Sequence, residues 1–148
     1  MNNIIIRVAT KKDLPHILQL HKELALKGEK ELSLSRAGKI FDKIRACPDY
    51  KIYVTSMKGK IVGTFALLIM DNLAHKGAPS AIVEDVAVAP EFQGLGIGKK
   101  MMHFAMDLCR KKKCYKLILS SNKKRVKAHQ FYKSLGFAMH GYSFLIPL

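Results

Sequence analysis

The segment that decides the fold of this chain is Val83-Glu84-Asp85-Val86-Ala87-Val88-Ala89-Pro90-Glu91-Phe92-Gln93-Gly94-Leu95-Gly96-Ile97-Gly98, which leads from an apolar strand into an amphipathic helix. Three of its last five residues, Gly94, Gly96 and Gly98, are glycines at the point where the helix is expected to begin. Glycine has no Cβ, so the backbone N–H groups there stay uncovered and a large anionic ligand can approach them closely. The segment therefore predicts a loop that binds phosphate groups.

Two common phosphate loops fit this segment poorly. A Walker loop has a glycine separated by four residues from Gly-Lys-Ser/Thr, but Gln93 takes the place of that glycine and Lys100 that of the hydroxyl. A dinucleotide fingerprint needs Gly-x-Gly-x-x-Gly and an acidic residue about twenty residues further on, and neither is present. The pattern disfavours both nucleotide-binding interpretations.

A third kind of loop matches. The pattern Gln-x-x-Gly-x-Gly at Gln93, Gly96 and Gly98 follows a Val-x-Val-x-Pro strand end, and it resembles the acetyl-CoA pyrophosphate loop of the GNAT N-acetyltransferases. Downstream, the segment from Arg125 to Phe137 resembles the last helix of that family, with its Ala-x-x-Phe-Tyr-x-x-x-Gly-Phe pattern. The two motifs stand in the order of the family, and the resemblance is specific over residues 82–137.

The resemblance implies an α/β (α+β) fold. Its mixed, mostly antiparallel sheet would have six to seven strands flanked by about four helices, and it would splay at the acetyl-CoA site. With 148 residues, 49% of them hydrophobic, the chain suits a single domain over 1–148. Periodicity and turn residues predict strands at 4–8, 50–57, 61–70, 82–88, 117–119 and 142–146. They predict helices from a Thr10 capping box to Gly28, from Ser35 to before Pro48, after the glycine loop, and near 128–135.

The strand before the glycines carries two adjacent acids. With a period of two, Glu84 would share one face with Val86 and Val88, while Asp85 would share the other with Ala87. A carboxylate on an apolar strand face should have a raised pKa, which suits a general base. An ion pair between Glu84 and a lysine is the alternative.

The resemblance implies transfer of an acetyl group from acetyl-CoA to a primary amine of a small molecule, by direct attack in a ternary complex. Glu84 would be the general base and Tyr132 the general acid; core packing of Tyr132 beside Phe131 is the alternative. The backbone N–H of Val86 would face the thioester oxygen. The residues expected to bind the cofactor are Val86, Ala87, Val88, Gln93, Gly94, Leu95, Gly96, Ile97, Gly98, Lys99, Asn122 and Arg125.

Three of the expected contacts each have two alternatives. Many family members have Asn where Arg125 stands, so either Arg125 or Asn122 would make that cofactor contact. Asp85 would anchor a cationic amine or bridge strands. His75 lies in a loop that would contact the acceptor or simply cover the surface.

The formal charge of +15 is the main argument for another function. Basic blocks at 110–113 and 123–127 could be solvated helix ends, could help to bind the phosphates of CoA, or could bind nucleic acid. The blocks lack interleaved aromatics, which disfavours nucleic acid. The alternatives to an enzyme are therefore a non-catalytic acyl-CoA-binding sensor and, less favoured, a basic nucleic-acid-binding module.

The remaining features are negative or general. Three cysteines and six histidines have no metal-binding spacing, so we expect no metal and three reduced thiols. No apolar run has the length of a membrane span, and we expect a cytoplasmic protein with no membrane partner. A homodimer would follow the habit of the family.

Overall fold

The computed structural model describes residues 3–22, 24–25 and 28–148. The chain forms two compact units, Met1–Ile118 and Leu119–Leu148. The first unit contains β1 (Ile4–Val8), α1 (Leu14–His21), α2 (Leu34–Ala46), β2 (Tyr50–Met57), β3 (Lys60–Met70), β4 (Ser80–Val88), α3 (Ile97–Lys111) and β5 (Lys116–Ile118), with short 3-10 turns at Lys11–Asp13, His75–Gly77 and Pro90–Phe92. The second unit contains α4 (Val126–Ser134). The expectation of a single domain stays a prediction.

The sheet is mixed and mostly antiparallel, as expected. Its strand order is β1-β2-β3-β4-β5, and only the β4–β5 pair is parallel. The described residues form five strands, so the expected six to seven is too many. The missing strand is the one expected at 142–146, which makes no ladder. Alternating apolar residues become a strand only where a neighbouring strand accepts their hydrogen bonds, and Tyr142 and Phe144 are instead both 93% exposed.

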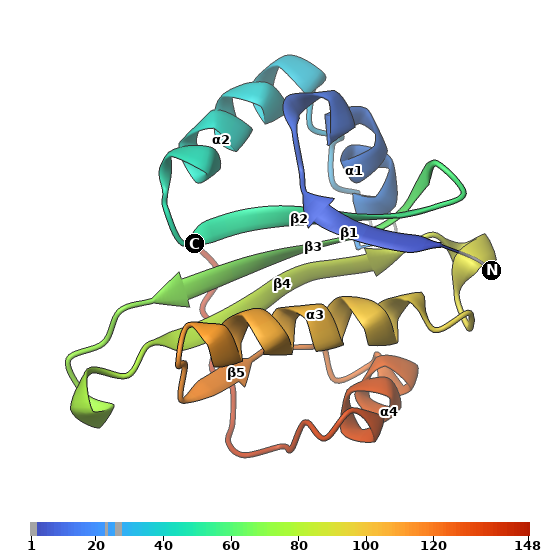
Figure 1. Cartoon of the computed structure of the whole chain (residues 1–148). Helices are drawn as coiled ribbons and strands as arrows, with labels where there is room; N and C mark the ends of the chain where they lie inside the picture. The colour runs from blue at the N-terminus through green and yellow to red at the C-terminus, as the bar shows by residue number, and fades with distance from the viewer. Residues whose placement is uncertain (1–2, 23, 26–27) are drawn as a thin grey trace. The chain divides into compact units, whose positions relative to one another are not determined.

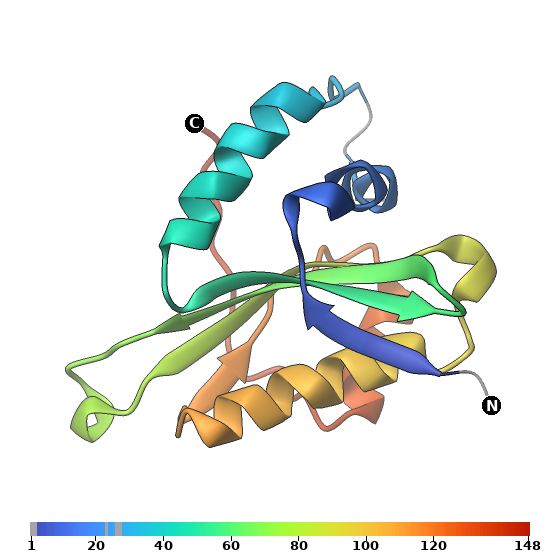
Figure 2. The same ribbon diagram turned by 45° about the horizontal axis from the view of Figure 1, so that its top comes forward.

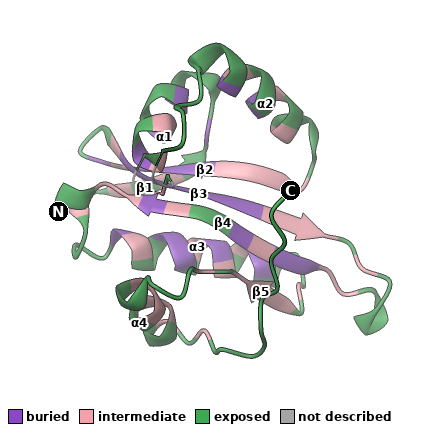
Figure 3. Ribbon diagram, turned by 180° about the vertical axis from the view of Figure 1, so that it is seen from behind, coloured by how far each residue is buried: buried purple, intermediate pink, exposed green. Residues whose placement is uncertain are grey.

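Helices cover both faces of the sheet in the first unit. α1 and α2 lie over one face, and α3 lies along the other (Figures 1 and 2). β3 is therefore buried continuously from 62 to 67, because neither face of the strand reaches solvent. The innermost side chains include Val62, Phe65, Val83 and Met101. Figure 3 shows buried stretches of ribbon along β3, β4 and α3.

The first helix starts as expected but ends early. The Thr10 capping box forms, with the N–H of Thr10 donating to the Asp13 carboxylate at 2.7 Å. α1 ends at His21, and Leu24, Ala25 and Gly28 are not helical, so the expected helix to Gly28 is too long. Residues 23, 26 and 27 of that expectation lie outside the described residues.

The cap of the second helix is Ser33 and not Ser35. Its Oγ accepts the N–H of Arg36 at 3.3 Å. An N-cap side chain accepts the N–H of the residue three positions later. Arg36 stands three positions after Ser33, so Ser33 is the cap. Periodicity alone did not separate two serines placed so close together.

Candidate functional site

The strand before the glycine loop carries a β-bulge. Thr64 of β3 pairs with Ala87, but Ala66 pairs with Glu84, so two residues, Asp85 and Val86, face the single Phe65. Asp85 has φ 52°, in the left-handed region. An extra residue in that conformation bends the strand and leaves main-chain groups without a ladder partner. The strict alternation expected over 82–88 is therefore wrong, because the bulge shifts it between Glu84 and Ala87.

The sheet also opens beside this bulge. β5 pairs with β4 only at Ser80, Ala81 and Ile82, whereas β4 continues to Val88. From Val83 onward, one edge of β4 has no strand partner among the residues that the structure describes. The expected splay is thus present, and it exposes backbone N–H groups along the part of β4 that leads to the glycines.

Alternate residues of β4 point their backbone N–H and C=O groups toward the open edge. Ala89 donates its N–H to the carbonyl of Val62 on β3 at 2.9 Å. Because successive residues of a strand point their N–H and C=O groups to opposite sides, those of Val88 point away from β3 and those of Ala87 point toward it. The side-chain amide of Gln93 donates to the carbonyl of Val88 at 3.0 Å. Gln93 thereby attaches the loop to the end of the strand.

The glycine loop ends in the first turn of α3. Gly94 and Gly96 both have φ 78°, and a Cβ at either would meet nothing within 4 Å. Glycine is therefore required there by backbone conformation and not by lack of space. The first hydrogen bond within α3 joins the N–H of Lys100 to the carbonyl of Gly96 at 3.1 Å. The N–H groups of Ile97, Gly98 and Lys99 have no acceptor within the helix, which makes them suitable for an anion.

The two adjacent acids have neighbours that the motifs did not indicate. Burial raises the pKa of the Glu84 carboxyl above its ordinary value, although the residue reaches solvent, and the charge of Asp85 adds to the shift. Burial also raises the pKa of Tyr50, helped by the charges of Asp85 and Glu84. Burial lowers the pKa of His21, and Asp85 opposes that shift. His21 therefore lies within electrostatic range of Asp85, and Tyr50 lies within range of both carboxylates.

Sequence reasoning missed His21 and Tyr50 for a clear reason. His21 is the last residue of α1, which packs over β3 and β4, and Tyr50 is the first residue of β2. Both come within electrostatic range of the acids through the packing of separate elements. The available signal was weak: a polar ring ending the apolar stripe of a helix and a tyrosine beginning a strand.

His75 lies at the other end of β4. β4 begins at Ser80 and leads to the glycine loop beyond Val88, while the turn that holds His75 precedes Ser80. The ring of His75 stacks on that of Tyr115, with centroids 4.1 Å apart and planes at 24°. The structure does not bring His75 to Glu84, and its contact with an acceptor stays a prediction.

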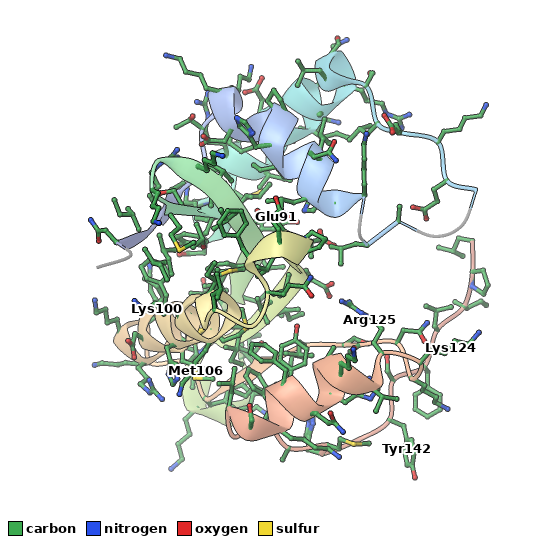
Figure 4. The ribbon with its side chains drawn as sticks, turned by 90° about the vertical axis from the view of Figure 1, so that its right-hand side faces the viewer. Glu91, Lys100, Met106, Lys124, Arg125 and Tyr142 are labelled. Carbon is green, nitrogen blue, oxygen red and sulfur yellow. The ribbon has the colours of Figure 1, made fainter. Side chains whose placement is uncertain are left out.

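The second unit holds the remaining expected residues. On α4, the ring of Tyr132 contacts those of Phe131 and Phe137, with centroids 5.1 and 5.7 Å away. The Asn122 carboxamide accepts the N–H of Lys124 at 2.9 Å, and the Asn122 carbonyl accepts the N–H of Arg125 at 3.0 Å, so Asn122 shapes the turn before α4. Arg125 is exposed (Figure 4). The roles of all three toward a cofactor stay predictions.

Burial sets the protonation state of the Cys109 thiol. Cys109 is buried, and burial together with Cys114 raises its pKa to about 12, which keeps it a thiol at neutral pH. Within the described ranges, no three or more His, Cys, Asp or Glu side chains gather as a candidate metal site. No helix found in those ranges is long and apolar enough to cross a membrane.

The chain belongs to the acetyltransferase (GNAT) family, whose model matches residues 15–137. It is 39% identical over 93 residues to the glucosamine 6-phosphate N-acetyltransferase of Trypanosoma brucei brucei, which covers 61% of this chain and 59% of the relative. The chain thus matches about three fifths of the length of that relative.

Two further likenesses extend over nearly the whole chain. The 5-NmdU N-acetyltransferase of Pseudomonas phage PaMx11 is 31% identical over 140 residues, covering 95% of this chain and 91% of the relative. The solved glucosamine-6-phosphate N-acetyltransferase of Arabidopsis thaliana has a TM-score of 0.85 at 26% identity, covering 98% of each chain. The fold expected from the two motifs is therefore confirmed.

Proposed function

We propose that this protein transfers an acetyl group from acetyl-CoA to a primary amine of a small molecule, by direct attack in a ternary complex. The observation that carries the proposal is the bulged end of β4, which parts from β5 and is tied by Gln93 to the glycine loop. The open edge of β4 and the uncovered N–H groups at the start of α3 together suit a ligand that has an amide-rich arm and a pyrophosphate. Acetyl-CoA is such a ligand.

Cofactor binding follows from the directions of the backbone groups. The N–H groups of Ile97, Gly98 and Lys99 would hold the pyrophosphate, with help from the macrodipole of α3. The outward N–H of Val88 would bond the pantetheine arm along the open edge. In the bulge, the N–H of Val86 would polarise the thioester carbonyl, a contact worth roughly 3 to 4 kcal/mol of barrier lowering.

Acetyl transfer requires a neutral amine. A free primary amine has a pKa of about 10, so it must lose a proton before it attacks. In the proposal, Glu84 takes that proton as the amine nitrogen bonds to the carbonyl carbon. The C–S bond then breaks, and Tyr132 donates its phenolic proton to the departing thiolate. The raised pKa of Glu84 supports its part, because a stronger base accepts the proton more readily.

The acceptor would lie against Glu84 and Asp85, on the side of the sheet covered by α1. The negative charge of Asp85 would orient an ammonium group before its deprotonation, and His21 and Tyr50 would line the same region. The acceptor named for one of the curated relatives, glucosamine 6-phosphate, belongs to that protein. It supports a small amine as the class of acceptor here. The proposal includes a cytoplasmic location, where an exposed thiol such as Cys47 stays reduced.

A panel of primary amines tests the proposal. The full chain is incubated with acetyl-CoA and each of several amino sugars, amino acids, polyamines and aminomethylated nucleosides, and release of CoA is followed. We expect release that depends on the amine. Tight binding of CoA with no turnover of any amine would identify a sensor instead, and salt-dependent binding of DNA with no affinity for CoA would identify a nucleic-acid-binding module.

A further inference from the structure

β1 is an edge strand without the usual protection against pairing. It has β2 on one side, and no strand of the described residues pairs with its other side. Natural edges are blunted by Pro, Lys, bulges or inward charges. β1 reads Ile4-Ile5-Ile6-Arg7-Val8, and its one charge, Arg7, is held by Asp13 through two bonds of 2.7 and 2.9 Å. The edge is therefore open to another strand.

The free hydrogen-bonding groups of this edge can be assigned. Ala9 donates its N–H to the carbonyl of Ile52 at 2.8 Å, next to the registered pair Val8 and Tyr53. Since residues of an antiparallel ladder alternate in direction, Ile5 and Arg7 bond to β2, while the N–H and C=O groups of Ile4 and Ile6 point outward. Their spacing is that of a strand ladder.

A groove of about 500 Å³ lies beside this edge, between β1 and the first turns of α3. Its apolar side chains are Ile6, Leu95 and Phe104, and its basic ones are Lys99, Lys100 and His103. Lys100 and His103 are exposed, and Lys100 is labelled on α3 in Figure 4. The groove contains one carboxylate, Asp107, which is already paired with Arg110 at 2.7 Å.

The charge of the groove decides between two occupants. A second copy pairing β1 with β1 would carry its own Lys99 and Lys100 into the interface, and like charges there would repel. A strand with acidic side chains would meet those lysines with opposite charge, and its apolar side chains would cover Ile6 and Phe104. The net charge of +15 on the whole chain adds attraction for an acidic segment.

We propose that the groove between β1 and α3 binds an extended acidic segment of a partner protein, which adds as a strand to β1 at Ile4 and Ile6 and places its carboxylates against Lys100 and His103. Strand addition supplies affinity through main-chain bonds, and the side chains that point toward α3 supply selectivity. This surface requires no acetyl transfer and lies on β1, away from the open edge of β4, although Leu95, Gly96 and Lys99 of its lining also belong to the loop expected to bind the cofactor.

Amide hydrogen exchange on the full ¹⁵N-labelled chain tests the proposal. The probe is a blocked decapeptide of alternating Glu and Val, and the control peptide has Lys in place of Glu. We expect the acidic peptide to bind and to slow exchange at Ile4 and Ile6 at least tenfold, with little change at Ile5 and Arg7. The affinity should fall as salt is raised.

Matched charge reversals on α3 locate the contact. Lys100→Glu should weaken binding of the acidic peptide about tenfold, while Lys111→Glu, at the other end of the same helix, should leave it within about twofold. Lys111→Glu should also leave the affinity for CoA unchanged. Equal binding of both peptides, unchanged exchange at Ile4 and Ile6, or equal losses in the two variants would overturn the proposal. Protection of Ile4 and Ile6 in a dimer without peptide would also overturn it and would name a second copy as the occupant.

Discussion

The side-chain amide of Gln93 donates a hydrogen bond to the carbonyl oxygen of Val88 at 3.0 Å. Val88 ends β4, and Gln93 directly precedes the first glycine of the loop. One bond therefore fixes the distance between the open strand edge and the start of α3. In the proposed function these two places hold the pantetheine arm and the pyrophosphate, so Gln93 acts by positioning them.

Replacing Gln93 should weaken cofactor binding without unfolding the protein. Gln93→Ala removes one exposed hydrogen bond, worth about 1 kcal/mol, so the Kd for CoA should rise roughly threefold to tenfold. Calorimetric titration with CoA measures it. Gln19→Ala, an exposed glutamine on α1, is the control and should leave the Kd unchanged. An equal rise in both variants would remove the positioning role.

The pH dependence of turnover should report Glu84. Its raised pKa means that the carboxylate is protonated, and the rate lost, as pH falls through a value above the ordinary 4.5. Glu84→Gln should lower kcat/KM about 100-fold or more and abolish this acidic limb. Glu91→Gln, on the turn before the loop, controls for loss of a nearby charge (Figure 4). A Glu84→Gln enzyme with the wild-type pH profile would exclude the base.

Asp85 combines an unusual backbone with a charge, and two variants separate them. Asn adopts the left-handed region at least as readily as Asp, whereas Ala does not. Asp85→Asn should keep the stability, and Asp85→Ala should lose about 1 kcal/mol in urea unfolding.

The charge of Asp85 should be visible at His21. Since Asp85 raises the pKa of His21 against the lowering by burial, Asp85→Asn should lower that pKa further in an NMR titration. Asp107→Asn, on α3, serves as the control and should leave it unchanged. A His21 pKa that is insensitive to Asp85→Asn would contradict the shared region.

Two glycines should respond to alanine in opposite directions. A Cβ on Gly63 would lie 2.8 Å from the Met101 sulfur and 3.3 Å from the Ala87 carbonyl oxygen, both in a tightly packed region beside the bulge. Gly63→Ala should therefore cost about 1 to 3 kcal/mol of stability. Gly38 in α2 has open space, and Gly38→Ala should stabilise by about 0.5 to 1 kcal/mol. Urea unfolding of both variants measures the contrast, and destabilisation by Gly38→Ala would refute it.

Asp13 should contribute to acid sensitivity. Its bonds to Arg7 lower its pKa from 3.8 to about 2, so its stabilising effect is present above pH 3.8 and disappears as pH falls through about 2. Asp13→Asn should cost about 2 kcal/mol at pH 7, and the difference from wild type should vanish near pH 2. Asp42→Asn weakens two exposed ion pairs, with Lys11 at 2.6 Å and with Arg45 at 3.7 Å, and should cost at most about 1 kcal/mol. Equal costs in the two variants would contradict the assignment.

Much of the fold was predictable because its signals are local. The hairpin of β2 and β3 follows from two apolar runs around Lys58-Gly59, and the start of α1 follows from Thr10 and Asp13. The strand predicted at 142–146 does not form. An apolar segment is a local signal, whereas a strand needs a partner that the segment does not specify.

The sequence by itself determined the family, the glycine loop and the adjacent acids, since each depends on residue types at short spacing. Only the tertiary structure decided the bulge at Asp85 and Val86, the parting of β4 from β5, and the electrostatic influence of Asp85 on His21 and Tyr50. The physical reason is that strand register and the contacts between α1, β2 and β4 are set by pairing and burial across distant parts of the chain, which no short pattern contains.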